Sequence, residues 1–448
     1  MAIYVGPGPI SGPGPSFSPV FCTSPATFWT GTDGRIRTSL PHLGILCHDA
    51  VLFHILRFAF CEIEFNVYLW KKISAMNPFY LIPHTPKAYF CDRAQETEDM
   101  IRFLDNGSNI TLISPRRYGK TGLIYHVFDC LKERKQKVEL FYADIYATSS
   151  SDDFISVLAE AVSKELKKDA LIKSFFQKLG SIRPVFTQDP LSGEPKLSFT
   201  LQTDAQRRYT LKALLEFLEH RPTKVVVAID EFQQIRSYEG LSMEALLRTH
   251  IQPLTNVQFI FSGSKKHTMA EMFTAENSPF YESAALYTLE KIDREVYAGF
   301  ISEQFAAQKK TITPEAIDFI LDWTRCHTFY TQTLCNRVFS AAKKEVSLVD
   351  ALIAADAILK ENEGGFLERR ALLTAKQWKF LVSVAKEGEV REPTGAAFLH
   401  KYGLGAPSTA ARLLNALTEK EMLLETKTLE GSTYCVYNVF LSRWLEKL

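Results

Sequence analysis

The pattern of apolar and polar residues changes along the chain and predicts alternating strands and helices after residue 76. Short apolar runs at 110–113, 139–145, 224–234 and 257–261 predict strands, and helices are expected between them. The run from 224 is continuous rather than alternating, which is typical of a strand buried on both faces in a parallel sheet. This part of the chain is therefore expected to be an α/β domain.

One helix of this domain is predicted at 152–166, with Ser151 or Asp152 as its N-cap, and another is predicted at 242–251. Residues 167–204 are interrupted by several prolines and a glycine, and a surface insertion is expected there.

The pattern after residue 290 is helical first and mixed later. Four helices with short connections are predicted at 293–308, 314–324, 328–344 and 348–361, which indicates an antiparallel helical bundle on the flank of the core. Gly364 and Gly365 are expected to form a hinge. Beyond it the order is helix, helix, helix, hairpin, helix. The first three helices are predicted at 374–386, 394–402 and 408–419, and the two strands of the hairpin at 423–428 and 433–438. This order predicts a winged helix, with Ser408 after Pro407 as the cap of its third helix and with Phe440, Trp444 and Leu445 in its core.

Residues 1–75 differ in kind from the rest. They begin with a Gly/Pro repeat that forms no packed element, and the apolar run at 50–70 contains Arg57, Glu62 and Glu64. Its longest uncharged part is too short for a membrane crossing of about 20 residues, and no signal peptide pattern is present. We expect Met76 to be the natural start and 1–75 to be a non-native or disordered extension.

Composition places limits on the class of protein. A chain of 448 residues with 46% hydrophobic and 23% charged residues is expected to form two or three globular domains. The net charge of +1 predicts no overall attraction to nucleic acid or to acidic membranes. The eight cysteines include no C-x-x-C pair, so we expect reduced, buried thiols in a cytoplasmic protein.

The most informative motif is Ser-Pro-Arg-Arg-Tyr-Gly-Lys-Thr at 114–121, between a predicted strand and a helix. It fits a phosphate-binding loop: the chain turns at Gly119, and backbone N–H groups cradle phosphate oxygens. Lys120 reaches the β and γ phosphates, and the Thr121 hydroxyl ligates Mg²⁺. Ser114 replaces the usual first glycine, and this small residue is compatible with the turn if its φ is negative.

A second motif is the acid pair at the end of the strand that begins at residue 224. Asp230 and Glu231 follow the apolar run, where ligands bind in open α/β sheets. We expect Asp230 to hold Mg²⁺ and Glu231 to polarise the attacking water. An apolar strand ending in Asp-Glu is common by itself, but downstream of a phosphate-binding loop it favours a catalytic site.

Several further residues are candidates with open alternatives. Ser264, or else Ser262, is placed at a strand tip to sense the γ phosphate, although a plain Ser/Gly turn is the alternative. Arg248 lies on the helix before that strand and is either an arginine finger toward a neighbouring subunit or a solvated helix residue. Arg116 and Arg117 would add positive charge at the phosphates or contact a partner.

Taken together, these motifs resemble a known family. Phe-Cys-Asp-Arg at 90–93 with Glu96, the loop at 114–121, Ala-Ile-Asp-Glu-Phe-Gln at 228–233 and Phe-Ser-Gly-Ser at 261–264 are similar to the prokaryotic and archaeal ATPase family. That family belongs to the AAA+/STAND branch of P-loop NTPases, and the resemblance covers residues 76–448. ATP-binding proteins of Bacteroidales-type anaerobic bacteria typically carry the loop S-P-R-R-x-G-K-T, so a serine at the position of Ser114 is typical of the proteins that this chain resembles.

The resemblance implies a doubly wound parallel sheet at 76–290, a helical lid at 291–369 and a winged helix at 370–448. It implies ATP and Mg²⁺ as ligands, with residues 114–122, from Ser114 and Pro115 through Tyr118 to Gly122, around the phosphates. Asp92 and Arg93 would help to seat the nucleotide. The lid motif of the family reads G-H-P-Y-Y-x-Q, and this chain has Cys326 for the glycine and Thr328 for the proline, which favours a packed His327 over a nucleotide contact.

The expected function is ATP hydrolysis that moves the lid and winged helix, and the alternative is a slow-turnover nucleotide-gated switch acting on a protein partner or DNA. The third helix of the winged domain offers Arg412 and Lys420 against Glu419 and Glu421, a weak basic footprint. A packing or autoinhibitory role and a DNA-contacting role both stay open. A homo-oligomer is compatible with the sequence, and no peptidase motif is present.

Overall fold

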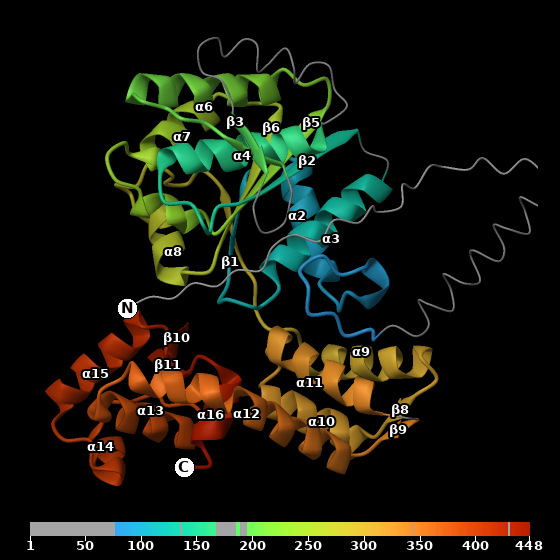
Figure 1. Cartoon of the computed structure of the whole chain (residues 1–448), viewed down its shortest axis with the longest axis vertical. Coiled ribbons are helices and arrows are strands. Elements are labelled where there is room, and N and C mark those ends of the chain that lie inside the picture. Colours follow the sequence, from blue (N-terminus) through green and yellow to red (C-terminus); the bar gives the residue numbers. More distant parts are fainter. Residues whose placement is uncertain (1–76, 135–136, 167–184, 189–194, 343, 429–430) are drawn as a thin grey trace, which may run out of the picture. The chain divides into compact units, whose positions relative to one another are not determined.

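The computed structural model describes residues 77–134, 137–166, 185–188, 195–342, 344–428 and 431–448 (Figure 1). The predictions for residues 1–75, and most of the predicted insertion at 167–204, lie outside the described residues. In the described part of the chain, no helix combines the length and apolar character needed to cross a membrane. The five cysteines that the structure describes are all free, as expected from their spacing.

A five-stranded parallel sheet forms the centre of the first domain, in the order β2-β5-β6-β1-β7 (Figure 1). Its strands are β1 (Ile110–Ile113), β2 (Val138–Asp144), β5 (Lys224–Asp230), β6 (Val257–Gly263) and β7 (Ala285–Thr288). The four predicted strands are confirmed. The edge strand β7 was not predicted, because its residues Ala-Leu-Tyr-Thr are partly exposed and form no apolar run.

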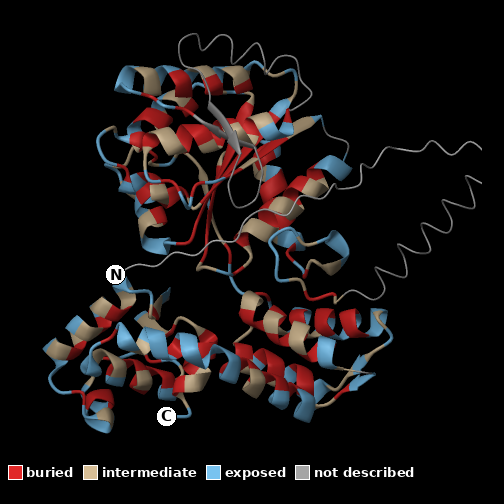
Figure 2. Cartoon of the chain, in the orientation of Figure 1, coloured by how far each residue is buried: buried red, intermediate tan, exposed pale blue. Residues whose placement is uncertain are grey.

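Helices cover both faces of this sheet. One face packs on α2 (Ala94–Asp105) and α3 (Lys120–Glu133). The other packs on α4 (Ser151–Glu165), α6 (Asp204–Glu219), α7 (Met243–Ile251) and α8 (Lys266–Thr274). Successive residues of β5 alternate between the two hydrophobic clusters, as the two-residue period of a strand requires. The doubly wound sheet is thereby confirmed, and Figure 2 shows its central strands as buried.

The start of α4 corrects one prediction. Its N-cap is Ser150, whose side chain accepts a hydrogen bond from the Asp153 N–H. Asp152 lies inside the helix instead, and its carboxylate pairs with Arg207 at 2.6 Å. The predicted caps were one and two residues late because Ser150, Ser151 and Asp152 are all good capping residues.

Shorter elements complete this domain. They are the 3₁₀ turns η1 (Lys87–Tyr89) and η2 (Phe232–Ser237) and the antiparallel pair β3 (Val185–Gln188) and β4 (Pro195–Ser198). The β3–β4 pair lies in the predicted insertion.

The region predicted to be a helical lid contains α9 (Arg294–Ala307), α10 (Pro314–Thr324), α11 (Thr328–Ala341) and α12 (Leu348–Ala371), with a short parallel pair of β8 (Thr311–Ile312) and β9 (Glu345–Val346). The hinge predicted at Gly364 and Gly365 is wrong, because both residues lie inside α12. Phe366 is buried against Trp444, and Glu363 accepts a hydrogen bond from the same indole. Contacts on both sides of the two glycines thus hold this part of α12 against the winged helix, although each helical glycine costs about 1 kcal/mol.

The winged helix comprises α13 (Ala375–Glu387), α14 (Ala396–Tyr402), α15 (Pro407–Glu419), β10 (Leu423–Thr428), β11 (Gly431–Val436) and α16 (Val439–Leu445). β10 and β11 form the antiparallel wing. α15 has Ala406 as its N-cap and Pro407 in its first turn, so Ser408 is not the cap. The lid and the winged helix share one hydrophobic cluster, in which the rings of Tyr330 and Phe440 lie 4.6 Å apart.

Candidate active site

The loop between β1 and α3 has the backbone of a phosphate-binding loop. Gly119 precedes the first residue of α3 with a φ of 100°, a left-handed conformation that favours glycine. The first N–H groups of α3 therefore point out of the helix end, where anions bind. Ser114 is buried and does not have a positive φ, so serine fits the position where the first glycine is usual.

Lys120 is directed back at the loop. Its side chain is buried, and the ammonium donates hydrogen bonds to the carbonyls of Ser114 (3.1 Å) and Pro115 (3.4 Å). Burial lowers the pKa of Lys120, and the carboxylates of Glu231 and Asp230 act in the opposite direction. The ammonium is buried and its hydrogen-bond partners are uncharged carbonyls, which suits the binding of an anionic ligand.

The predicted metal ligands Thr121 and Asp230 are in direct contact. The Thr121 hydroxyl donates to Asp230 Oδ2 at 2.6 Å, and the Tyr142 hydroxyl donates to the same oxygen at 2.9 Å. Asp144 at the end of β2 lies opposite Asp230 in the sheet. Burial raises the pKa of Asp144. Sequence reasoning missed Tyr142. It could have been found from its position two residues before Asp144, on the same side of the strand.

Glu231 is held by two donors. It has a left-handed backbone with a φ of 57°, and its Oε2 accepts hydrogen bonds from Ser264 Oγ and from Gln233 Nε2, both at 2.6 Å. Ser264 follows β6, the strand between β5 and β1. Ser264 rather than Ser262 therefore meets the acid pair. Ser262 is fully buried, and among the described residues its hydroxyl has no partner.

The remaining loop residues contact the C-terminal half of the chain. The Arg116 N–H donates to Tyr437 Oη at 2.7 Å, and the Arg117 guanidinium lies 4.3 Å from the ring centroid of Phe329. The carbonyl of Tyr118 accepts a hydrogen bond from Thr328 Oγ1 at 3.1 Å.

A cavity of about 510 Å³ connects these groups. Its lining includes loop residues 116–122, Asp144, Asp230 and Glu231 on one side and Thr328, Phe329 and Gln332 of α11 on the other. It continues along the segment 80–93, which gives it an apolar end beside the phosphate-binding loop. The volume and the lining of this cavity suit a small ligand with one charged and one apolar end.

The structure separates Arg93 from Asp92. Arg93 lines the cavity, but its guanidinium is buried and donates to Glu96 (2.6 Å) and to the carbonyl of Glu290 (2.7 Å). Asp92 is exposed and does not line this cavity. His327 does not line it either, and its ring packs against Tyr118 and Tyr330.

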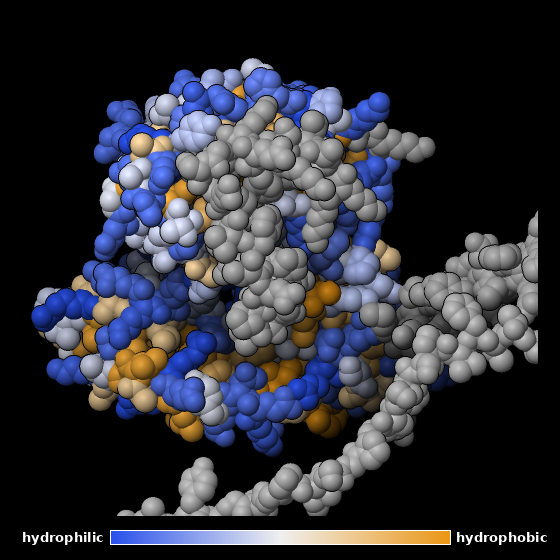
Figure 3. All heavy atoms as spheres, turned by 45° about the horizontal axis from the view of Figure 1, so that its top comes forward, coloured by the Kyte–Doolittle hydropathy of each residue, from blue (hydrophilic) through white to orange (hydrophobic). Residues whose placement is uncertain are grey.

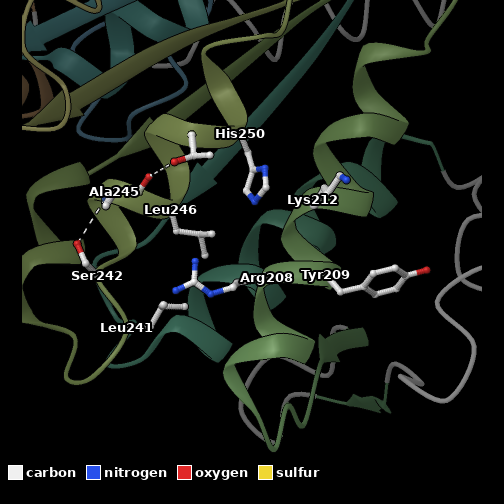
Figure 4. Close-up of a pocket in the computed structure, with 9 residues that line it drawn as sticks. Arg208, Tyr209, Lys212, Leu241, Ser242, Ala245, Leu246 and His250 are labelled. Atoms are coloured by element: carbon white, nitrogen blue, oxygen red, sulfur yellow. Dashed lines mark hydrogen bonds between the residues drawn. The ribbon is translucent and has the colours of Figure 1, made fainter.

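Arg248 lies on α7, outside the lining of this cavity. Its Nε donates to the carbonyl of Pro279 at 3.1 Å. A second cavity, of about 340 Å³, lies between α6 and α7 and is lined by residues that include Arg208, Lys212, Leu246 and His250 (Figure 4). It shares no residue with the first cavity. Most of the described surface in Figure 3 is hydrophilic, with scattered hydrophobic patches.

The parallel sheet, the loop before α3 and the acid pair at the end of β5 define a P-loop NTPase, with one strand inserted between the loop strand and the acidic strand. Residues 90–326 match the family model of the ATPase domain found predominantly in Archaea, and residues 365–447 match a probable winged helix domain. The first match covers more than half of the chain, which therefore belongs to this ATPase family and carries a C-terminal winged helix.

Solved structures show the same fold. The Walker-type ATPase of Pyrococcus abyssi is 18% identical, with a TM-score of 0.57, over 82% of this chain and 99% of that one. The ORC2 protein of Aeropyrum pernix, solved as ADPNP and ADP complexes, is 14% identical, with a TM-score of 0.50, over 79% of this chain and 92% of that one. The comparison with curated proteins found no match.

Proposed function

We propose that this ATPase hydrolyses ATP with Mg²⁺ in the cavity beside the phosphate-binding loop, and that hydrolysis moves the lid and the winged helix. The observation that carries the proposal is the convergence of Lys120, the Thr121–Asp230 pair and Glu231 at one edge of the sheet. The buried ammonium of Lys120 would bind the β and γ phosphates, because among the described residues it donates to two backbone carbonyls and to no anionic group.

Thr121 and Asp230 fit a magnesium site. Mg²⁺ takes oxygen ligands, is usually bound by one or two carboxylates together with substrate phosphates, and would neutralise charge that develops on the phosphates. In the described ranges no group of three or more His, Cys, Asp or Glu side chains is placed to hold a metal. These residues therefore favour a site in which one carboxylate and one hydroxyl of the protein bind Mg²⁺ together with phosphate oxygens of the nucleotide.

Glu231 would orient the attacking water. Ser264 and Gln233 both donate to its Oε2 and fix the carboxylate, and its Oε1 is the oxygen that would accept a hydrogen bond from water. Ser264, at the tip of the strand beside the loop strand, would connect the position of Glu231 to the γ phosphate. Catalysis of this kind relies on positioning and electrostatics rather than on covalent chemistry.

Direct contacts between the lid and the phosphate-binding loop support the coupling of the lid to this site. Thr328 at the start of α11 donates to the carbonyl of Tyr118, and Phe329 packs on the Arg117 guanidinium. A change in the loop on nucleotide binding or hydrolysis would therefore reach α11 directly.

Two substitutions test the assignment. Lys120→Ala is expected to abolish ATP binding, and Glu231→Gln is expected to keep binding while lowering turnover by about 100-fold or more, as loss of a general base does. Binding is measured by calorimetry and turnover by phosphate release. The matched controls are Lys132→Ala, at the exposed far end of α3, and Glu239→Gln, an exposed residue after η2. Full turnover in Glu231→Gln would show that another residue orients the water.

The same contacts of Glu231 favour a second candidate function, a nucleotide-gated switch with slow turnover, because two hydrogen bonds to Oε2 restrict the movement of this carboxylate. We propose that such a switch would act on a protein partner or on DNA through the winged helix. On α15, Arg412 is exposed, whereas the Lys420 ammonium that follows the helix donates to the carbonyl of Leu372. Turnover measured with and without duplex DNA separates the two functions, because a several-fold rise indicates a DNA-coupled ATPase and tight ATP binding with negligible turnover indicates the switch.

A role of Arg248 as an arginine finger requires a second copy of the chain. The mass of the protein in solution, with and without ATP, tests this proposal. An unchanged mass leaves Arg248 with its contact to Pro279 as a structural residue.

A further inference from the structure

The winged helix contacts Arg116 of the phosphate-binding loop through two side chains. The Arg116 N–H donates to the hydroxyl of Tyr437, which lies between β11 and α16, at 2.7 Å. Glu421, which follows α15, places its carboxylate 3.5 Å from the guanidinium of the same Arg116. One residue of the loop thus receives two oxygen acceptors from the winged helix.

Tyr437 is fixed in this position by its own backbone and surroundings. Its N–H donates to the carbonyl of Met422 at 3.0 Å, which ties it to the start of the wing. Burial raises the pKa of Tyr437 to about 12, against the opposing effect of the Arg116 N–H. The hydroxyl therefore stays protonated at neutral pH and accepts from the loop as a neutral group.

Arg116 also lines the cavity assigned to the nucleotide. The N–H groups and basic side chains of such a loop are the donors that phosphate oxygens use. Tyr437 and Glu421 present the same kind of acceptor atom to the same donors. While the winged helix is in contact with the loop, the backbone N–H of Arg116 is therefore occupied and its guanidinium is paired with a carboxylate.

We propose that Tyr437 and Glu421 form a latch that competes with the phosphates of ATP for Arg116, so that ATP binding releases the winged helix from the loop. This inference rests on the proposed function, because it requires ATP to bind at the loop. Coupling of this kind is reciprocal: if the latch weakens ATP binding by some factor, ATP weakens the contact of the winged helix with the loop by the same factor.

The test uses the full chain with Tyr437→Phe and, separately, Glu421→Gln, and measures ATP affinity by calorimetry. Removing the hydroxyl is expected to tighten ATP binding about 2- to 10-fold, the range that a net hydrogen bond corresponds to. Glu421→Gln is expected to tighten it about 1.5- to 5-fold, because the ion pair is partly exposed.

Matched controls lie in the same wing. Tyr434 donates to Glu425 at 3.0 Å, within the β10–β11 pair and not to the loop. Tyr434→Phe and Glu425→Gln remove a hydroxyl and a charge of the same kinds, and they are expected to leave ATP affinity unchanged. A thermal melt without nucleotide shows whether each variant is folded.

Hydrogen exchange gives an independent readout of release. ATP is expected to speed amide exchange at residues 431–442 in the wild type, and to have no such effect in Lys120→Ala. Weaker or unchanged ATP binding in folded Tyr437→Phe and Glu421→Gln would overturn the latch, as would exchange at 431–442 that ATP slows or leaves unaltered. If Lys120→Ala instead bound ATP normally, the proposed site itself would be wrong.

Discussion

At the scale of single residues, His327 shows how a polar side chain can be kept for its shape. Its ring lies 4.7 Å from the Tyr118 ring and 4.5 Å from the Tyr330 ring, in edge contacts. Only 6% of the residue is exposed, and Nδ1 is buried with no partner among the described residues. Burial lowers the pKa of His327 to about 3, so the folded protein holds it neutral.

This pKa predicts a pH dependence of stability. The ordinary value is 6.5, so between pH 6.5 and about 3 the unfolded chain binds a proton that the folded chain does not, and stability falls as the pH falls. His327→Phe is expected to remove a loss of about 2 kcal/mol between pH 7.5 and pH 5, because each pH unit in this range corresponds to about 1.4 kcal/mol. Chemical unfolding of both proteins at the two pH values measures the difference, with the exposed His400→Gln as the control. Parallel pH profiles for wild type and His327→Phe would contradict the assignment.

At the scale of elements, strand β6 carries the connection between the loop and the acid pair. It pairs with β1 on one side and β5 on the other, and Ser264 follows it. Gly263, its last residue, leaves no room for a side chain, because a Cβ there would overlap with Gln233 Oε1 and with Met269.

Gly263→Ala is therefore expected to lower the free energy of unfolding by about 1–3 kcal/mol, as overpacking does. It should also lower turnover, since the displaced Gln233 is a donor to Glu231. The control is Gly299→Ala in α9, where a Cβ would meet nothing within 4 Å. Thermal unfolding and phosphate release measure both effects. An active and fully stable Gly263→Ala protein would show that β6 does not constrain Glu231.

The sequence predicted elements where a local pattern exists. Helix α10 begins and ends as predicted, because Thr313 caps it and Pro314 opens it. The two-residue strands β8 and β9 were not found, because their pairing depends on partners far away in the chain. The same reason applies to the site. Lys120, Thr121, Asp230 and Glu231 follow from motifs, whereas Gln233 and Tyr437 acquire their roles only from tertiary contacts.

At the scale of the whole described chain, ligand binding and stability are linked. A ligand that binds only the folded protein stabilises it by about 2.7 kcal/mol at a concentration of 100 times its Kd. ATP with Mg²⁺ is therefore expected to raise the unfolding temperature of the wild type and not that of Lys120→Ala. Differential scanning calorimetry at several ATP concentrations measures the shift, and Lys132→Ala should behave like the wild type. An equal rise in Lys120→Ala would mean that ATP stabilises the chain at another site.

Helix α12 has a consequence for how motion is transmitted. It runs without interruption from Leu348 to Ala371, and its 24 residues span about 36 Å at 1.5 Å per residue. The same hydrophobic cluster lines the lid and the winged helix on either side of it. A rotation of the lid where it meets the phosphate-binding loop would therefore be transmitted along α12 to the winged helix.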